Sequence, residues 1–198
     1  MKVAFDEHVP PAVVEAFQLF ANQGRFKASA KGVTFSSSVN YNPDPSDSDY
    51  RKGQDDPWIR RFAKSGGKVI VTADKAMKSA SHERKALLDE GFIVIFLGKE
   101  WAGWKFTRKC AFLLNWSLPI IEVATTAAPG TFWLVPAKWD GPDKLKQISN
   151  ADLKLEKTKR QKAALAEVAA SRARKRASAP EAQTDLLIDP SPPSDKAT

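Results

Sequence analysis

The sequence contains few of the residues from which thiol, zinc and nucleophilic sites are built. Among its 198 residues there are one cysteine, Cys110, and two histidines, His8 and His82. A single cysteine excludes an internal disulfide framework and a cysteine-rich zinc site. Two histidines do not favour a histidine-based metal site or a catalytic triad. The chain also lacks the motif G-x-S-x-G and the phosphate loops G-x-x-x-x-G-K-[ST] and G-x-G-x-x-G, so serine-based hydrolysis and nucleotide binding through those loops are not indicated.

Long apolar runs are also missing. No stretch approaches the roughly 18 apolar residues of a membrane span, and the apolar run within residues 1–11 is too short for a signal peptide. Hydrophobic residues nevertheless make up 42% of the chain and charged residues 27%, which is typical of a chain that buries a core. We therefore expect a soluble, cytoplasmic protein without a membrane partner.

Positive charge is abundant but unevenly distributed. The chain holds 31 basic and 23 acidic residues, a net charge of +8. Residues 154–176 alone contain 9 basic and 2 acidic residues, and residues 177–198 contain 1 and 4. A concentrated basic segment suggests a polyanionic partner, most simply nucleic acid, although a solvated tail explains the composition equally well. We predict a basic helix over residues 151–176 and a disordered tail over residues 177–198.

The remaining residues alternate between two hydrophobic periodicities. Short apolar runs predict buried strands at residues 2–5, 68–72 (KVIVT), 92–97 (FIVIFL) and 131–135. Amphipathic spacing predicts helices at residues 11–23, from Asp56 to Gly66, at residues 79–90, and at residues 105–127 with a break at Pro119. Residues 29–54 are rich in Ser, Asn, Asp and Pro and predict a long polar loop. This alternation indicates an α/β domain with a mostly parallel sheet over residues 1–136, followed by a linker at 137–150.

Carboxylates follow two of the predicted strands. Asp6 and Glu7 come directly after the first strand, and Asp74 lies two residues after KVIVT. In parallel α/β sheets, ligand sites form beyond the C-terminal ends of the strands. One acid after a strand is an ordinary turn residue, but acids after two neighbouring strands can reach a shared cation.

Helical geometry places two further acids toward the core. Asp56 lies on the same helix face as Ile59, although a plain N-cap role would also explain it. Glu83 lies on the same face as the apolar Leu87. A glutamate is costly to bury unless it is paired or binds a metal, so this position favours a ligand role.

Four inward acids without a histidine or thiol partner suit a hard cation, Mg²⁺ or Mn²⁺. Such ions activate water and neutralise developing charge in phosphodiester cleavage. Nearby cationic side chains could hold the substrate phosphates; these are Lys75, Lys78 and Arg84.

Several strings resemble PIN-like domains of bacterial toxin–antitoxin type. They are FDEH at the end of the first strand, D-x-W-I from Asp56, VTADKAM around Asp74, and SHERKALLDEGF, which contains Glu83. The resemblance covers residues 1–136 and implies a three-layer α/β/α sandwich. It also implies a metal-dependent endoribonuclease, the toxin of a toxin–antitoxin module, acting on RNA and bound by an antitoxin or by a second copy of the chain.

The same resemblance assigns site roles. The family's acidic quartet matches Asp6, Asp56, Asp74 and Glu83, and two accessory positions match Glu7 and Thr72. The basic segment after residue 150 lies outside the family pattern.

Competing interpretations remain. A haloacid-dehalogenase phosphatase requires Asp-x-Asp after the first strand, where this chain has Asp6-Glu7-His8, and a response-regulator receiver would leave the inward Glu83 unexplained. The main alternative is a non-catalytic PIN-like module that binds nucleic acid or a protein. In that case Trp101 and Trp104 could stack on unpaired bases, although paired tryptophans more often pack in a core.

Overall fold

Six strands form one sheet in the computed structural model, which describes residues 1–52, 54–74, 77, 81–137, 139 and 144–149. The strand order is β2-β1-β3-β4-β5-β6. The first five strands in this order are parallel, and β6 is antiparallel to β5. Their bounds are Lys2–Phe5 (β1), Thr34–Ser37 (β2), Gly67–Thr72 (β3), Ile93–Phe96 (β4), Phe132–Leu134 (β5) and Lys146–Ile148 (β6).

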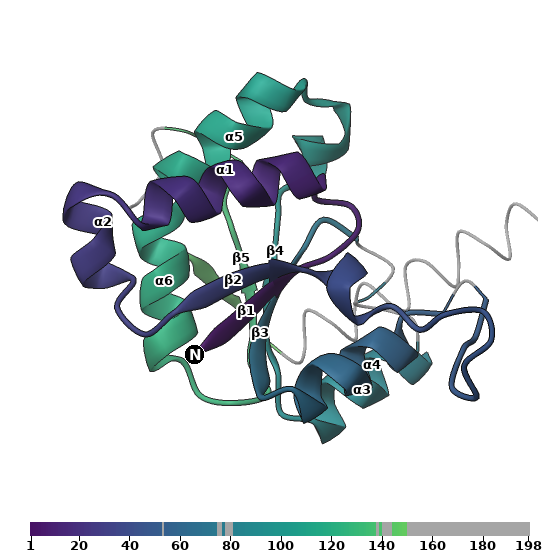
Figure 1. Ribbon diagram of the computed structural model, residues 1–198. Helices are drawn as coiled ribbons and strands as arrows, with labels where there is room; N and C mark the ends of the chain where they lie inside the picture. Colours follow the sequence, from purple (N-terminus) through teal and green to yellow (C-terminus); the bar gives the residue numbers. More distant parts are fainter. Residues whose placement is uncertain (53, 75–76, 78–80, 138, 140–143, 150–198) are drawn as a thin grey trace, which may run out of the picture. The chain divides into compact units, whose positions relative to one another are not determined.

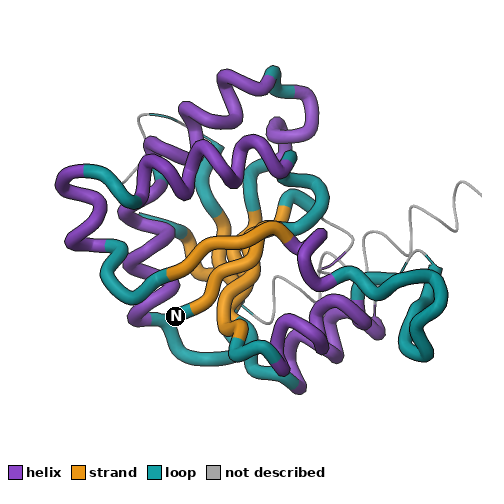
Figure 2. Tube along the Cα trace, in the orientation of Figure 1, coloured by secondary structure: helices purple, strands orange, loops and turns teal. Residues whose placement is uncertain are grey.

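Helices cover both faces of the sheet (Figures 1 and 2). One layer consists of Pro11–Ala21 (α1), Gly24–Ser29 (α2), Phe106–Asn115 (α5) and Ser117–Thr126 (α6). The other consists of Asp56–Lys64 (α3) and Ser81–Asp89 (α4). Two short 3₁₀ helices, Ser38–Tyr41 (η1) and Lys99–Gly103 (η3), follow β2 and β4. The predicted three-layer α/β/α sandwich is confirmed.

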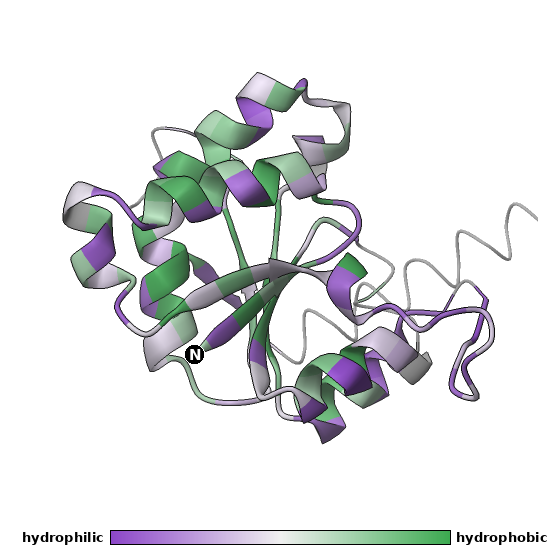
Figure 3. Ribbon diagram, viewed as in Figure 1, coloured by the Kyte–Doolittle hydropathy of each residue, from purple (hydrophilic) through white to green (hydrophobic). Residues whose placement is uncertain are grey.

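Successive side chains of each central strand enter two separate cores. Val3 and Phe5 pack with Phe17 of α1, whereas Ala4, between them in the sequence, packs with Phe62 of α3. Because both faces are covered, β1, β3 and β4 carry runs of consecutive apolar residues rather than alternating ones, with exposed Lys2 and Lys68 near the starts of β1 and β3. Figure 3 shows these strands as largely hydrophobic and the chain between η1 and α3 as largely hydrophilic.

The strand order places a crevice next to β1. The chain leaves β1 toward β2 on one side and then returns to β3 on the other. At such a switch point the loops after the two parallel strands diverge, and ligands of open α/β sheets bind there. The acids predicted after residues 2–5 and 68–72 lie at this point.

The predicted polar loop over residues 29–54 was partly wrong, because it contains β2 and η1. The strand Thr34–Ser37 lies at the edge of the sheet and is only partly buried. Its backbone pairing with β1 stabilises it, so it needs no apolar side-chain pattern. Residues 42–52, 54 and 55 form a connection without strand or regular helix.

Two other boundaries also differ from the prediction. The helical segment breaks at Trp116 rather than at Pro119. Pro119 lies in the first turn of α6, where a missing backbone N–H removes no helical hydrogen bond. The predicted linker at 137–150 contains β6, whose first two side chains are exposed.

The predicted basic helix over 151–176 and the predicted tail over 177–198 lie outside the described residues. Within the described residues, no helix combines the length and the apolar character needed to cross a membrane.

Candidate functional site

A cleft of about 450 Å³ opens beyond the C-terminal ends of β1 and β3. Its walls come from the turn after β1, the connection before α3, the start of α3, the turn after β3 and the first turn of α4. The lining residues are Glu7, His8, Asn42, Pro43, Tyr50, Arg51, Gln54, Asp55, Trp58, Asp74 and Glu83.

Three carboxylates come together in this cleft. Asp55, Asp74 and Glu83 each offer one oxygen, and these oxygens all lie within 4.8 Å of one another. Asp55 and Asp74 are half-buried, and Glu83 is 8% exposed. A compact, all-oxygen and partly desolvated donor set suits a hard divalent cation.

Each carboxylate is placed by a local feature of its element. Asp55 occupies the N-cap position of α3 but makes no capping hydrogen bond; its carboxylate instead accepts a hydrogen bond from the Trp58 side chain. The Asp74 backbone N–H donates to Thr72 Oγ1 at 2.9 Å, which fixes the turn after β3. Glu83 lies in the first turn of α4, where the helix dipole favours a negative charge.

Asp6 comes directly after β1 and is 1% exposed. Its carboxylate accepts hydrogen bonds from the Thr72 hydroxyl and, at 3.1 Å, from the His8 backbone N–H. The Thr72 hydroxyl therefore bonds both Asp6 and the Asp74 backbone, and it connects the ends of β1 and β3. Asp6 does not line the cleft and is not one of the three grouped carboxylates.

The cleft is electrostatically unfavourable for its own carboxylates. Burial raises the pKa of the Asp55 carboxyl above its usual range, and the Trp58 hydrogen bond opposes this. The charges of Glu7, Asp6 and Asp74 raise the same pKa further. Because a bound cation would relieve this repulsion, the electrostatics as well as the donor chemistry fit a divalent metal.

His8 places a positive charge at the edge of the same cleft. Its hydrogen bond to Asp6 is the largest cause that raises the pKa of His8 to about 9, partly offset by burial. The Nδ1 atom lies 3.5 Å from Asp6 Oδ2. In the metal-free protein this raised pKa favours the protonated imidazole at neutral pH, which can attract an anion or donate a proton.

The structure brings only part of the predicted quartet together. Asp74 and Glu83 are grouped as expected, but the carboxylate from the start of α3 is Asp55 rather than Asp56. Asp56 Oδ1 is buried and makes no hydrogen bond within the described residues. The sequence offers Asp56 as the N-cap, but α3 begins at Asp56 and its N-cap is Asp55. The presence of two adjacent acids, Asp55 and Asp56, was the feature of the sequence that could have indicated Asp55 as the alternative ligand.

The residues predicted to be accessory or to bind phosphate lie in different environments. Glu7 is exposed and lines the cleft, whereas Thr72 is fully buried beneath it. Arg84 is half-buried on α4, next to Glu83. Lys75 and Lys78 lie outside the described residues.

Trp101 has a structural role. It is 1% exposed, and its indole N–H donates to the His8 carbonyl oxygen at 3.1 Å, which fixes η3 against the turn after β1. The Trp104 ring is half-buried, with the Arg108 guanidinium 4.5 Å from its centroid. Because its ring is buried, Trp101 is not available to stack on a base.

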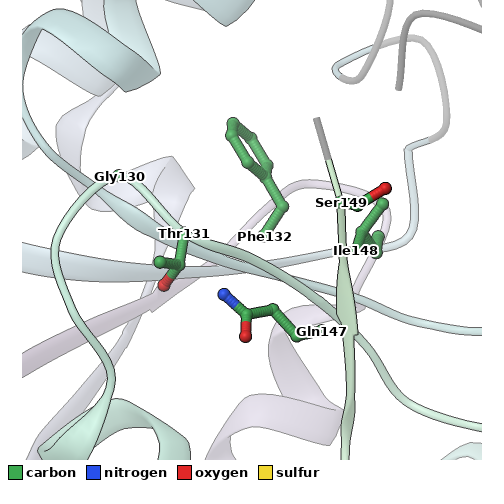
Figure 4. Close-up of a pocket in the computed structure, with 6 residues that line it drawn as sticks. All are labelled: Gly130, Thr131, Phe132, Gln147, Ile148 and Ser149. Atoms are coloured by element: carbon green, nitrogen blue, oxygen red, sulfur yellow. The ribbon is translucent and has the colours of Figure 1, made fainter. Parts of the chain in front are cut away.

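A second hollow of about 350 Å³ lies beside β5 and β6 (Figure 4). It is lined by Gly130, Thr131, Phe132, Gln147, Ile148 and Ser149. These residues include no acid, histidine or cysteine, so this hollow offers no metal-binding chemistry.

Comparison with known proteins gives one family match. A family model described as a PIN like domain matches residues 1–99. The matched stretch contains β1 to β4 and all three grouped carboxylates. No curated protein and no solved structure matches the chain.

Proposed function

The chain belongs to the PIN-like domain family, and from this premise we propose that it is a metal-dependent endoribonuclease. PIN domains are generally nucleases, and the family typically uses a divalent metal. The observation that carries the proposal is the group of Asp55, Asp74 and Glu83 in a cleft at the switch point of the sheet. These three residues would hold Mg²⁺ or Mn²⁺. When bound, the metal would supply an activated water and neutralise charge on the scissile phosphate.

The residues of the chain itself perform three further tasks. Thr72 holds the two strand ends in register through its two hydrogen bonds. Protonated His8 offers a positive charge to an approaching phosphodiester. Arg84, together with Lys75 and Lys78, would contact the flanking phosphates.

The biological setting proposed for this activity is a toxin–antitoxin module. The support is the resemblance of the strings around Asp6, Asp74 and Glu83 to PIN-like toxins. An RNA substrate and an antitoxin protein would then be the partners, both met in the cytoplasm. Expression of this chain in bacteria tests the proposal. We expect it to arrest growth, and we expect co-expression of a small protein encoded beside it to relieve the arrest.

Substitution of the grouped acids tests the metal site. Asp55→Asn and Asp74→Asn should each lower Mn²⁺ affinity in calorimetry and reduce cleavage of single-stranded RNA by about 100-fold or more, because a lost ligand charge costs several kcal/mol. Asp56→Asn is the control. It removes the same charge one residue away and should retain most of the Mn²⁺ affinity and most of the RNA cleavage. Cleavage in excess EDTA, or full activity of a folded Asp74→Asn protein, would overturn the nuclease proposal.

A further inference from the structure

The cleft has a second wall, formed by residues 42–51 of the connection between η1 and α3. It contributes Tyr50 and Arg51 to the lining, and it contains none of the three grouped carboxylates, because Asp55 comes later in the connection. Tyr50 is half-buried and Arg51 is exposed. Neither residue belongs to a motif that the sequence reveals.

Arg51 is placed by its own turn rather than by an acid. Its Nη1 donates to the Ser48 carbonyl oxygen at 3.1 Å and to the Tyr50 carbonyl oxygen at 2.7 Å. Within the described residues no carboxylate pairs with it, although four acids line the same cleft. A guanidinium that is oriented by carbonyl groups and not neutralised by an acid is suited to bind an anion.

A clamp from α3 holds this wall in place. Arg61 Nε donates to Asp49 Oδ2 at 2.8 Å, and Arg61 Nη2 donates to Asp47 Oδ2 at 2.8 Å and to Asp49 Oδ1 at 2.5 Å. Asp47 also accepts from the Asp44 backbone N–H at 2.8 Å, and its carbonyl oxygen accepts from the Tyr50 N–H at 3.1 Å. The clamp therefore fixes the turn directly before the two lining residues.

We propose that Tyr50 and Arg51 bind the strand of a single-stranded RNA substrate, and that Arg61 is the residue that positions them. The Arg51 guanidinium would take a backbone phosphate, and the Tyr50 ring would stack on an unpaired base. The substrate class rests on the proposed function, but strand binding does not require cleavage. The two proposals can therefore fail separately.

Strand binding is measured on the full-length chain in excess EDTA, as the fluorescence anisotropy of a short labelled RNA over a range of salt concentrations. Arg51→Gln should weaken binding and reduce the magnitude of the salt slope by about 0.7, the contribution of one neutralised phosphate on a single strand. Tyr50→Leu should weaken binding by about 5-fold or more without changing the slope, because stacking carries no net charge.

The positioning role has its own variants. Arg61→Gln should reproduce the effect of Arg51→Gln and add nothing to it in the double variant, since both act through one contact. Arg60→Gln is the matched control. It removes the same charge from α3, and Arg60 only approaches Glu90 at 3.8 Å. Its salt slope should stay that of the unmodified protein.

Substitution of the two acids of the clamp distinguishes a positioning role from a general electrostatic effect on RNA binding. Asp47→Asn combined with Asp49→Asn raises the net charge of the protein by two, so that general electrostatics would tighten RNA binding. Loss of the clamp predicts the opposite, weaker binding. Tighter binding by this variant would overturn the positioning role, and an unchanged salt slope in a folded Arg51→Gln protein would overturn the phosphate contact. If RNA binding follows these predictions but no added metal produces cleavage, the nuclease proposal fails, whereas the proposal that Tyr50 and Arg51 bind RNA is supported.

Discussion

Single hydrogen bonds decide the character of several groups at the site. The same Asp6 carboxylate accepts from Thr72 and from the backbone of His8, and it also lies beside the His8 imidazole. Three donors therefore surround one buried carboxylate. Its hydrogen bond to the imidazole is the largest cause that raises the pKa of His8.

We expect the His8 imidazole of the metal-free protein to titrate at about pH 9, well above the usual value of about 6.5. Because the folded pKa is raised, the stabilisation from this contact is fully present below pH ~6.5 and disappears as the pH rises through about 9. NMR titration of the ring signals measures this directly. Asp6→Asn should lower the His8 pKa more than Glu7→Gln, because the Asp6 hydrogen bond is the largest cause and the Glu7 charge the smallest. Equal effects of the two variants would contradict this assignment.

The roles of Asp55 and Asp56 also depend on a small local difference, the residue at which α3 begins. Neighbouring positions on a helix are about 100° apart around its axis, so a shift of one residue in the helix start decides which acid faces the cleft. The two adjacent acids are chemically identical, and only the placement of α3 distinguishes them.

At the scale of elements, β3 and α3 are closely packed. The first residue of β3, Gly67, lies against the ring of Phe62, and a Cβ at this glycine would be 2.5 Å from the nearest ring carbon. The Phe62 ring is fully buried and packs between Tyr41 and Phe92, with centroids 4.9 and 5.6 Å away. It therefore has no space into which it could move.

Gly67→Ala should consequently lower the free energy of unfolding by about 1–3 kcal/mol, the usual cost of overpacking a core. Gly103→Ala, in η3, is the matched control, because nothing lies within 4 Å of its added Cβ. Urea denaturation of both variants provides the measurement. A loss of stability in the control that equals the loss in Gly67→Ala would show that backbone flexibility, not the clash with Phe62, is responsible.

At the scale of the whole molecule, charge separates the α/β domain from the chain that follows it. Residues 154–176 carry 9 basic and 2 acidic residues, whereas acids predominate among the charged residues of the cleft. We interpret the basic segment as a source of sequence-independent affinity for RNA, not as part of the catalytic site.

Replacement of Lys157, Lys159, Arg160 and Lys162 by glutamine should therefore weaken RNA binding and reduce the salt slope by up to about 2.8, or 0.7 for each phosphate no longer neutralised. Turnover at saturating substrate should not change. Replacement of Glu181, Asp185 and Asp189 by their amides is the control of opposite sign and should not weaken binding. An unchanged salt slope, together with lost binding of a protein partner, would instead identify the segment as a docking element.

The sequence by itself determined the architecture of the central sheet and the place of the site. Apart from the exposed Lys2 and Lys68 at their starts, the strands at residues 2–5, 68–72 and 92–97 are buried on both faces, and that burial appears directly as runs of consecutive apolar residues. The acids after the first two of these strands indicated the functional edge. The inward position of Glu83 followed from helical spacing, and the structure leaves it 8% exposed.

Tertiary structure alone decided the edges of the sheet and the walls of the cleft. The strands β2 and β6 are held by backbone hydrogen bonds to β1 and β5, and such pairing leaves no side-chain pattern. The clamp from Arg61 to Asp47 and Asp49 joins residues 14 and 12 positions apart through charges that are exposed or half-buried, and any solvated segment could contain such charges. Hydrophobic burial is encoded locally by periodicity. Backbone pairing and salt bridges depend on which segments meet, and only the folded chain determines that.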